Sequence, residues 1–226
     1  MNFYEQHPTF HLAVDCVVLG YEAGELKLLL YPRAFEPVKG SWSLMGGFVR
    51  EGESAEEAAS RVLKQTTGLD NIFLEQVSTF SHPLRDPFQR VVSIAFYALI
   101  RINSYNKKQA AMHGAKWLPL SDFPELIFDH REMVAQAVKK LQLKAGSSLV
   151  GSELLPQKFT LLQLRKLYEA IYQRKFDPGN FRKKMLSLGV LEKLDQKDST
   201  ASKKGAYYYK VKDNKTEEEL ERIVKH

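Results

Sequence analysis

The residues best suited to chemistry lie close together, in the segment Gly47–Leu69. Glu53, Glu56 and Glu57 supply carboxylates there, and hard divalent cations such as Mg²⁺ prefer anionic oxygen ligands. Glu56 and Glu57, however, fall in the first turn of an expected helix, where the helix dipole already favours acidic side chains. Glu53 is expected to pair with Arg61 as a structural tie across the loop. These carboxylates are therefore better explained by local structure than by metal binding.

The spacing of this segment resembles the signature of the Nudix family of hydrolases. That signature reads G-x5-E-x7-R-E-U-x-E-E-x-G-U, in which U is a bulky apolar residue. The chain supplies its positions in register at Gly47, Glu53, Arg61, Leu63, Gly68 and Leu69. The run Trp42–Val49 is also similar to that family's approach to the signature. Matches at so many fixed positions make coincidence improbable.

The departures from the signature bear on activity. The glutamates that follow the arginine are replaced by Val62, Gln65 and Thr66. In the family these carboxylates hold the divalent ions that neutralise a pyrophosphate and activate the attacking water, and neutral side chains are poor substitutes. The resemblance therefore implies a protein with no catalytic residue, no metal site and no cofactor. The alternative is an atypical Nudix hydrolase acting on a nucleoside diphosphate derivative.

Further motifs narrow the resemblance to the Nudix-related transcriptional regulators. They are His82–Pro87 with Gln89–Ser93, Phe128–His130, the junction Leu155–Thr160, and Asn180–Lys184. Members of that family join a degenerate Nudix sensor domain to a C-terminal winged helix. Some respond to ADP-ribose, and others, in the sugar-utilisation branch, respond to pentoses such as arabinose. The resemblance implies a DNA-binding regulator, here a repressor, controlled by a small effector.

Hydrophobic patterns predict the elements that position these motifs. Apolar runs predict strands at Phe10–Leu19, Leu26–Tyr31 and Val91–Ile100. Ser54 and Glu57 form a capping box for a helix that ends before Gly68. A second helix is expected from Asp129 to about Lys144. Strands with few helices indicate an α+β class, and the resemblance implies a Nudix-type α/β/α sandwich at residues 1–144.

The pattern changes after the second helix. Residues 145–158 contain Gly, Ser and Pro with little periodicity, and we interpret them as a linker. One helix then begins at Thr160 with Gln163 in a capping box, and another begins at Asp177–Pro178. Two short strands follow, Val190–Leu194 and Ala206–Val211. Helix, turn, helix and hairpin predict a winged helix-turn-helix domain at residues 159–226.

Positive charge is concentrated in this second part. Residues 1–149 carry equal numbers of basic and acidic side chains, so the whole formal net charge of +6 lies in residues 150–226. Such asymmetry is typical of a polyanion-binding module joined to a neutral one, although a solvated basic surface is the alternative. We expect double-stranded operator DNA as the partner. A homodimer is expected, because two-fold operators need two recognition helices.

The helix after Asp177 is the expected recognition helix. Phe181, Met185 and Leu188 recur with helical spacing and should face inward, which turns Lys183 outward. The candidate DNA-binding residues are Asn180, Arg182, Lys183 and Ser187 on this helix and Lys197, Lys203 and Lys204 in the wing. Asn, Arg and Lys supply donors for base edges and phosphates. The simpler alternative is a solvated helix that exposes the same residues.

The candidate effector-binding residues are Arg33, Trp42, Phe48 and Arg90. For each of them a role in the core or in surface pairing is the alternative. A pyrophosphate ligand needs metal ions or several cations, and Arg33 and Arg90 are the only nearby cations that we nominate. A neutral sugar needs hydrogen bonds and an aromatic face, which Trp42 or Phe48 could provide. The sequence therefore favours a sugar such as arabinose over ADP-ribose as the effector.

The chain shows no feature of a membrane protein. No apolar run approaches the roughly 20 residues that span a bilayer, and the first residues lack the basic and apolar regions of a secretory signal. We expect a cytoplasmic protein with no membrane partner.

Overall fold

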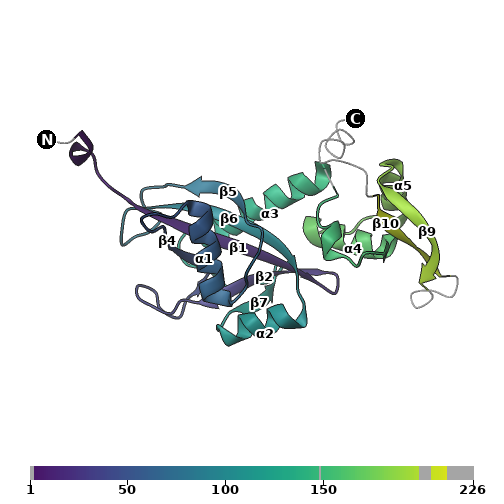
Figure 1. Ribbon diagram of the computed structural model, residues 1–226, viewed down its shortest axis with the longest axis horizontal. Coiled ribbons are helices and arrows are strands. Elements are labelled where there is room, and N and C mark those ends of the chain that lie inside the picture. Colours follow the sequence, from purple (N-terminus) through teal and green to yellow (C-terminus); the bar gives the residue numbers. More distant parts are fainter. Residues whose placement is uncertain (1–2, 148, 199–204, 213–226) are drawn as a thin grey trace. The chain divides into compact units, whose positions relative to one another are not determined.

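The computed structural model describes residues 3–147, 149–198 and 205–212. The chain divides into two compact units (Figure 1). The first unit comprises Met1–Gly20 and Lys27–Ala137, and the second comprises Tyr21–Leu26 and Val138–His226. No helix in the described part of the chain is long and apolar enough to cross a membrane.

The first unit is built on a seven-stranded sheet. Its strands are β1 (His11–Glu22), β2 (Glu25–Pro32), β3 (Trp42–Ser43), β4 (Met45–Phe48), β5 (Glu75–Phe80), β6 (Val91–Arg101) and β7 (Lys116–Pro119). The order is β3-β2-β1-β6-β5, with β4 paired to β1 and β7 paired to β2. β1 lies between other strands and is buried over most of its length. The strands predicted from the apolar runs are confirmed.

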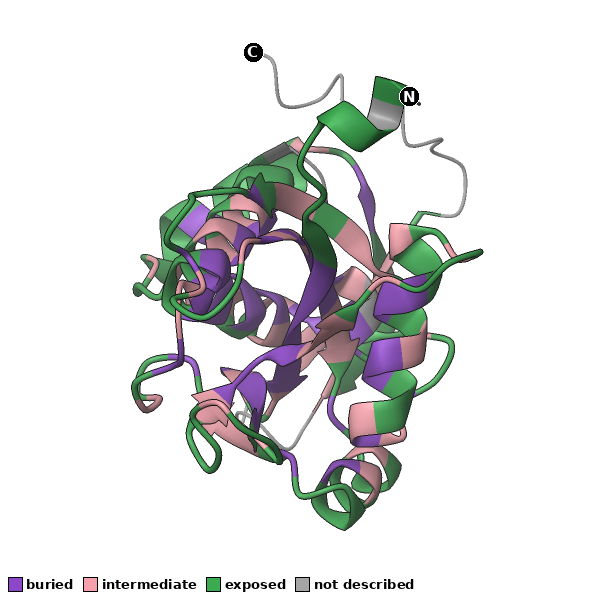
Figure 2. Cartoon of the chain, turned by 90° about the vertical axis from the view of Figure 1, so that its left-hand side faces the viewer, coloured by how far each residue is buried: buried purple, intermediate pink, exposed green. Residues whose placement is uncertain are grey.

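Helices cover both faces of β1. On one face, α1 (Ala55–Thr67) packs against β4 and shares a core with that strand and with Val14, Cys16 and Val18 of β1. Side chains alternate along a strand, so Asp15 points to the other face, where it meets His130 at the start of α3 (His130–Ser147). Figure 2 shows buried strands flanked by helices with exposed faces. A further helix, α2 (Ser104–Met112), precedes β7.

Local signals fix the ends of α1 as predicted. The Glu57 amide donates to the Ser54 hydroxyl at 3.1 Å, and the Glu57 carboxylate accepts from the Ser54 amide at 2.7 Å, which forms the capping box. Gly68 follows with φ of +70°, a left-handed conformation that favours glycine. Gly47 permits the close approach of β4 and α1, because a Cβ at this position would lie 2.8 Å from Val62.

Helix α3 extends beyond its predicted end at Lys144 and runs to Ser147. Its apolar stripe is buried as expected, with Met133, Val134, Ala137 and Leu141 inside. The first residues of the segment interpreted as a linker are therefore helical, and Leu149, Leu154 and Leu155 within that segment are buried. The domain limits 1–144, 145–158 and 159–226 remain a prediction.

The second unit contains the predicted helices and hairpin. After a short 3-10 helix (Ser152–Leu154) come β8 (Phe159–Thr160), α4 (Leu161–Tyr172), α5 (Pro178–Ser187), β9 (Leu191–Asp198) and β10 (Ala206–Val211). β9 ends later than predicted, and β8 adds an unpredicted strand to give the sheet order β8-β10-β9. The core includes Phe159, Leu164, Leu167, Ile171, Phe181 and Tyr209. The expected order of helix, turn, helix and hairpin is confirmed.

Candidate functional site

Glu53 and Arg61 form the expected tie between the loop and α1. Arg61 Nε donates to Glu53 Oε2 at 2.9 Å, and Arg61 Nη2 donates to the Phe48 carbonyl at 3.0 Å. Glu53 Oε1 accepts from the Arg50 amide at 2.8 Å. The hydrogen bond from Arg61, reinforced by that from Arg50, lowers the pKa of Glu53 to about 2. The pair thus fastens the loop after β4 to the helix.

The three residues that replace the signature glutamates do not fit a divalent cation. Val62 is buried and has no lone pair to offer. Gln65 accepts from Arg61 Nη1 at 3.4 Å, and the Thr66 hydroxyl donates to the Val62 carbonyl at 2.8 Å. None of the three is anionic, as Mg²⁺ ligands generally are. Among the residues that the structure describes, no three His, Cys, Asp or Glu side chains form a group that could hold a metal.

On the other face of β1, Asp15 anchors a buried polar network. Its Oδ2 accepts from the Ser93 hydroxyl at 2.6 Å and lies 3.6 Å from Arg85 Nη2. Arg85, which is 7% exposed, donates from Nε and Nη2 to the two oxygens of Asp129 at 2.9 and 2.8 Å. This two-pronged geometry is the strong form of a guanidinium–carboxylate pair. The network joins β1, β6, the loop after β5 and the start of α3.

His130 completes this network as a neutral side chain. Its Nδ1 accepts from the Leu44 amide at 3.2 Å, which leaves the proton on Nε2, 3.5 Å from Asp15 Oδ1. Burial lowers the pKa of His130, and the Asp15 carboxylate partly offsets this effect. The ring therefore links β1 to the segment before β4 without adding a charge.

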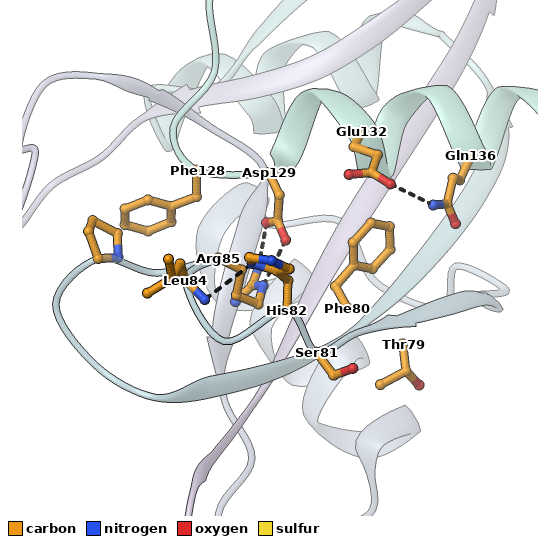
Figure 3. A pocket seen from close by; sticks show the side chains of 11 residues that line it. Thr79, Phe80, Ser81, His82, Leu84, Arg85, Phe128, Asp129, Glu132 and Gln136 are labelled. Atoms are coloured by element: carbon orange, nitrogen blue, oxygen red, sulfur yellow. Dashed lines mark hydrogen bonds and ion pairs between the residues drawn. The ribbon is translucent and has the colours of Figure 1, made fainter.

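A pocket of about 650 Å³ adjoins the network (Figure 3). It is lined by Thr79, Phe80, Ser81, His82, Leu84, Arg85, Pro87, Phe128, Asp129, Glu132 and Gln136. The loop after β5 forms one wall, and the first turns of α3 form the other. Aromatic faces with a few convergent polar groups are typical of small-molecule sites. Phe128 also has φ of +51°, and strained backbone of this kind clusters at ligand sites.

Two of the predicted effector residues contact the lining of this pocket. The Arg33 guanidinium lies 5.9 Å from the ring centre of Phe128, and Arg90 Nη1 lies 3.5 Å from the His82 carbonyl. Neither arginine lines the pocket itself. Arg33 and Arg90 thus lie at the border of the pocket, and their role in binding an effector remains a prediction.

The two predicted aromatic residues lie elsewhere on the first unit. Lys116 Nζ is 5.6 Å from the ring centre of Trp42, and Phe48, which is exposed, packs against His11 at 5.2 Å between ring centres. Neither lines the pocket, so the structure does not bring the four predicted residues into one site.

The residues that build the pocket and the network were not nominated from the sequence. The resemblance singled out the segments around Arg85 and Asp129, but these residues are 44 positions apart, and no local pattern shows that they pair. One signal was available. Asp15 interrupts the apolar run from Leu12 to Leu19 in β1, and a carboxylate there must find a partner because an unpaired buried charge is costly.

In the second unit, α5 buries apolar side chains on one face and exposes polar ones on the other, as predicted for a recognition helix. Phe181 and Met185 are buried, and Leu188 just past its end is half-buried. The predicted DNA-binding residues Asn180, Arg182, Lys183 and Ser187 are all exposed. In the described part of the chain no carboxylate pairs with Arg182 or Lys183. The helix therefore offers these cations to solvent or to a partner.

Contacts with α4 hold α5 in place. Asp177 caps α5 by accepting from the Asn180 amide at 2.8 Å, and Pro178 begins the helix as expected. The Phe181 ring lies 5.7 Å from the ring centre of Tyr168 on α4. Glu169 on α4 accepts from the Phe176 amide at 3.0 Å in the intervening turn. The turn is thus fixed at both ends, which gives the exposed face of α5 a defined direction within this unit.

The hairpin carries the predicted wing residue Lys197, whose Nζ lies 4.6 Å from the ring centre of Tyr207. Lys203 and Lys204 lie outside the described residues. The three tyrosines of β10 have different environments. Tyr209 is buried, while Tyr207 and Tyr208 are half-buried with lysines over their rings.

Known protein families match both units. A model of the NUDIX domain matches residues 9–137, and a model of the NrtR DNA-binding winged helix domain matches residues 151–211. The curated ADPR responsive transcriptional repressor NtrR of Acinetobacter baylyi is 31% identical over 208 residues, which span 90% of this chain and 83% of that protein.

Solved structures are also similar to this chain. Shewanella oneidensis NrtR complexed with a 27mer DNA has a TM-score of 0.74 and 31% identity, covering 89% of this chain and 93% of that chain. The NUDIX domain of the same protein complexed with ADP ribose has a TM-score of 0.53 and 31% identity, covering 62% of this chain and 94% of that chain. The fold class predicted from the sequence is confirmed by these matches.

Proposed function

The chain belongs to the family that joins a NUDIX domain to an NrtR DNA-binding winged helix, and we propose that it represses transcription until ADP-ribose releases it from its operator. The observation that carries this proposal is the exposed basic face of α5 in a unit that matches the NrtR winged helix. Asn180, Arg182 and Lys183 would enter the major groove, where such side chains read base edges and contact phosphates. Ser187 lies on the same helix, and the wing lysines would contact the backbone.

The effector we propose is ADP-ribose, because the similar repressor and the similar NUDIX domain are both described with it. The preference for a sugar such as arabinose has no support among these relatives. Without a metal, the pyrophosphate needs cations, and Arg33 and Arg90 border the pocket beside α3. Their guanidinium groups can pair with phosphate oxygens, while the carboxylates of the pocket suit ribose hydroxyls. Trp42 and Phe48 are weaker candidates because neither lines the pocket and their ring contacts are with Lys116 and His11.

The enzyme alternative is not favoured. Hydrolysis by a Nudix site needs carboxylates where this chain has Val62, Gln65 and Thr66, and the remaining Glu53 is held by Arg61. We therefore expect no measurable turnover of ADP-ribose with magnesium. Steady metal-dependent release of product that disappears in a Glu53→Gln variant would revive the hydrolase hypothesis.

We further propose that the active species is a homodimer. A two-fold operator presents two half-sites about one helical turn apart, which two α5 helices could occupy together. Light scattering of the free protein and of the operator complex would test this stoichiometry.

The proposal can be tested with the full-length protein and DNA selected by it from a random double-stranded pool. Fluorescence anisotropy should give a nanomolar or tighter dissociation constant for the selected DNA, as is typical of specific repressors. Micromolar ADP-ribose, without added metal, should weaken this binding, and arabinose should not. Failure to select any DNA would refute the regulator; release by arabinose alone would refute the effector.

A further inference from the structure

The outer part of the wing holds a cluster of charge that the assignment of α5 does not use. Lys193 and Lys197 are both exposed residues of β9, and their Nζ atoms lie 3.5 and 4.6 Å from the ring centre of Tyr207 on β10. Both distances are within the roughly 6 Å over which an aromatic ring attracts a cation. A single half-buried ring therefore gathers two ammonium groups.

The backbone of the hairpin produces this convergence. Tyr207 pairs with Lys197 and Tyr209 pairs with Lys193, so a bulge in β9 lies between these pairs. The register of Tyr209 with Lys193 would place Asp195 opposite Tyr207, and the extra residues of the bulge place Lys197 there instead. Lys193 reaches the same ring from its position opposite the neighbouring Tyr209. Gly205, at φ of +68°, lets the stem of Lys197 pack closely, because a Cβ there would lie 3.1 Å from Lys197 Cβ. A bulge that redirects a side chain is a common device in functional hairpins.

The two ammonium groups carry net positive charge. In the described ranges, no carboxylate forms an ion pair with Lys193 or Lys197. The neighbouring Glu192 pairs instead with Lys210 at 3.3 Å. Two like charges held on one ring repel each other, and an anionic partner would relieve that repulsion. The partner with the required density of negative charge is DNA, which carries one charge per about 1.7 Å of its axis.

We propose that Lys193 and Lys197 bind backbone phosphates of the operator, and that Tyr207 is the positioning residue that holds both ammonium groups ready for them. This inference rests on the proposed function and extends it from the predicted Lys197 to Lys193 and Tyr207. Phosphate contacts set the position of a protein on the duplex without reading its sequence. The wing cluster therefore adds affinity and register, while α5 adds sequence specificity.

The test measures DNA affinity of the full-length protein across a range of salt concentrations, on selected and on random DNA. Tyr207→Leu should weaken binding roughly 3- to 10-fold, as expected for two cation–ring contacts, and by the same factor on both DNAs. Tyr207→Phe keeps the ring and should bind as the wild type does. Lys193→Gln should lower the slope of log K against log[salt] by about 1 per wing. Lys166→Gln, at an exposed position of α4 in the same unit, is the control for loss of one positive charge and should leave the slope unchanged.

A double-mutant cycle separates positioning from folding. In a Lys193→Gln, Lys197→Gln background, adding Tyr207→Leu should cause no further loss of affinity, because the ring then has no ammonium group to hold. A further loss of the same size would overturn the proposal, as would wild-type affinity and slope in both Lys193→Gln and Tyr207→Leu. Circular dichroism would reveal whether Tyr207→Leu unfolds the wing. In that case the proposal is tested by the other two variants: it requires a lower salt slope for Lys193→Gln and wild-type affinity for Tyr207→Phe. A wild-type protein that binds no DNA would instead refute the proposed function.

Discussion

Arg85 illustrates how single residues in the first unit are constrained by burial. Its guanidinium contacts carboxylates from two elements, Asp129 before α3 and Asp15 on β1, and its side chain is almost entirely buried. A buried cation of this kind does not by itself make a protein stable, because its desolvation offsets the attraction. Replacing Arg85 with a neutral residue is destabilising, because the carboxylates of Asp15 and Asp129 then lose the cation that balances their charge in this buried network.

Arg85→Gln should therefore lower the free energy of unfolding by about 3 kcal/mol, the lower end of the range for breaking a buried pair. Urea unfolding at neutral pH is the measurement. Arg90→Gln is the control, because Arg90 is only half-buried and makes long contacts at 3.5 Å. Adding Asp129→Asn to Arg85→Gln should recover part of the loss. Equal stability of Arg85→Gln and the wild type would show that the network is dispensable.

Glu53 should make stability depend on pH. Its pKa in the folded protein is about 2 because Arg61 hydrogen-bonds its charged form, below the value of roughly 4.3 for a free glutamate. A lowered pKa stabilises the fold at pH values above the free value, and this contribution is lost as the pH falls towards 2.

The melting temperature of Glu53→Gln should accordingly lie below that of the wild type at pH 7, and the gap should narrow between pH 4 and pH 2. Thermal unfolding monitored by circular dichroism measures it. Glu51→Gln, an exposed position in the same loop, should show little difference at either pH. A gap that is constant across this range would mean that the Arg61 contact does not favour the ionised form.

At the scale of elements, α5 combines a fixed inner face with a free outer face. Phe181 and Met185 anchor it, and Asp177 caps it. The exposed cations contribute no ion pair to the described fold, so they can be replaced with little effect on stability. This separation makes α5 suitable for mutagenesis that reports on DNA binding alone.

Arg182→Ala or Lys183→Ala should cost roughly 1–3 kcal/mol on selected DNA if the side chain contacts a base, and less on random DNA. The readout is the ratio of the two affinities by anisotropy. Lys166→Ala, on α4 of the same unit, is the control for loss of one positive charge. If both α5 variants weaken binding equally on the two DNAs, they contact phosphates and the bases are read elsewhere.

At the scale of the whole molecule, α3 contributes to both units. Asp129, Glu132 and Gln136 at its start line the pocket. Further along, Gln142 belongs to the second unit, where its carbonyl accepts from the Tyr172 hydroxyl at 2.8 Å and its Nε2 donates to the Ile171 carbonyl at 3.0 Å. We expect this continuous helix to carry the coupling between effector and DNA binding that the proposed function requires, and such coupling is reciprocal at equilibrium.

Lys139→Gly tests that route, because glycine in an exposed helix position costs about 1 kcal/mol relative to alanine. The expected result is normal DNA affinity without effector but a smaller release by ADP-ribose than in the control Lys139→Ala. Anisotropy titrations at several ADP-ribose concentrations give the coupling factor. Identical coupling in the two variants would argue that the response does not depend on the rigidity of α3.

The sequence by itself determined the features that depend on neighbouring residues. Helix periodicity and capping are local. They therefore predicted the capping box of Ser54 and Glu57, the cap of α5 at Asp177 and the outward face of that helix. The loss of the signature glutamates follows directly from the residue types in the segment. Only the tertiary structure decided which distant groups meet. Ser93 and Asp15 are 78 positions apart, the pocket joins the loop after β5 to α3, and a bulge places Lys197 opposite Tyr207. Such encounters are set by sheet order and packing, since a buried charge takes whichever partner the fold brings to it.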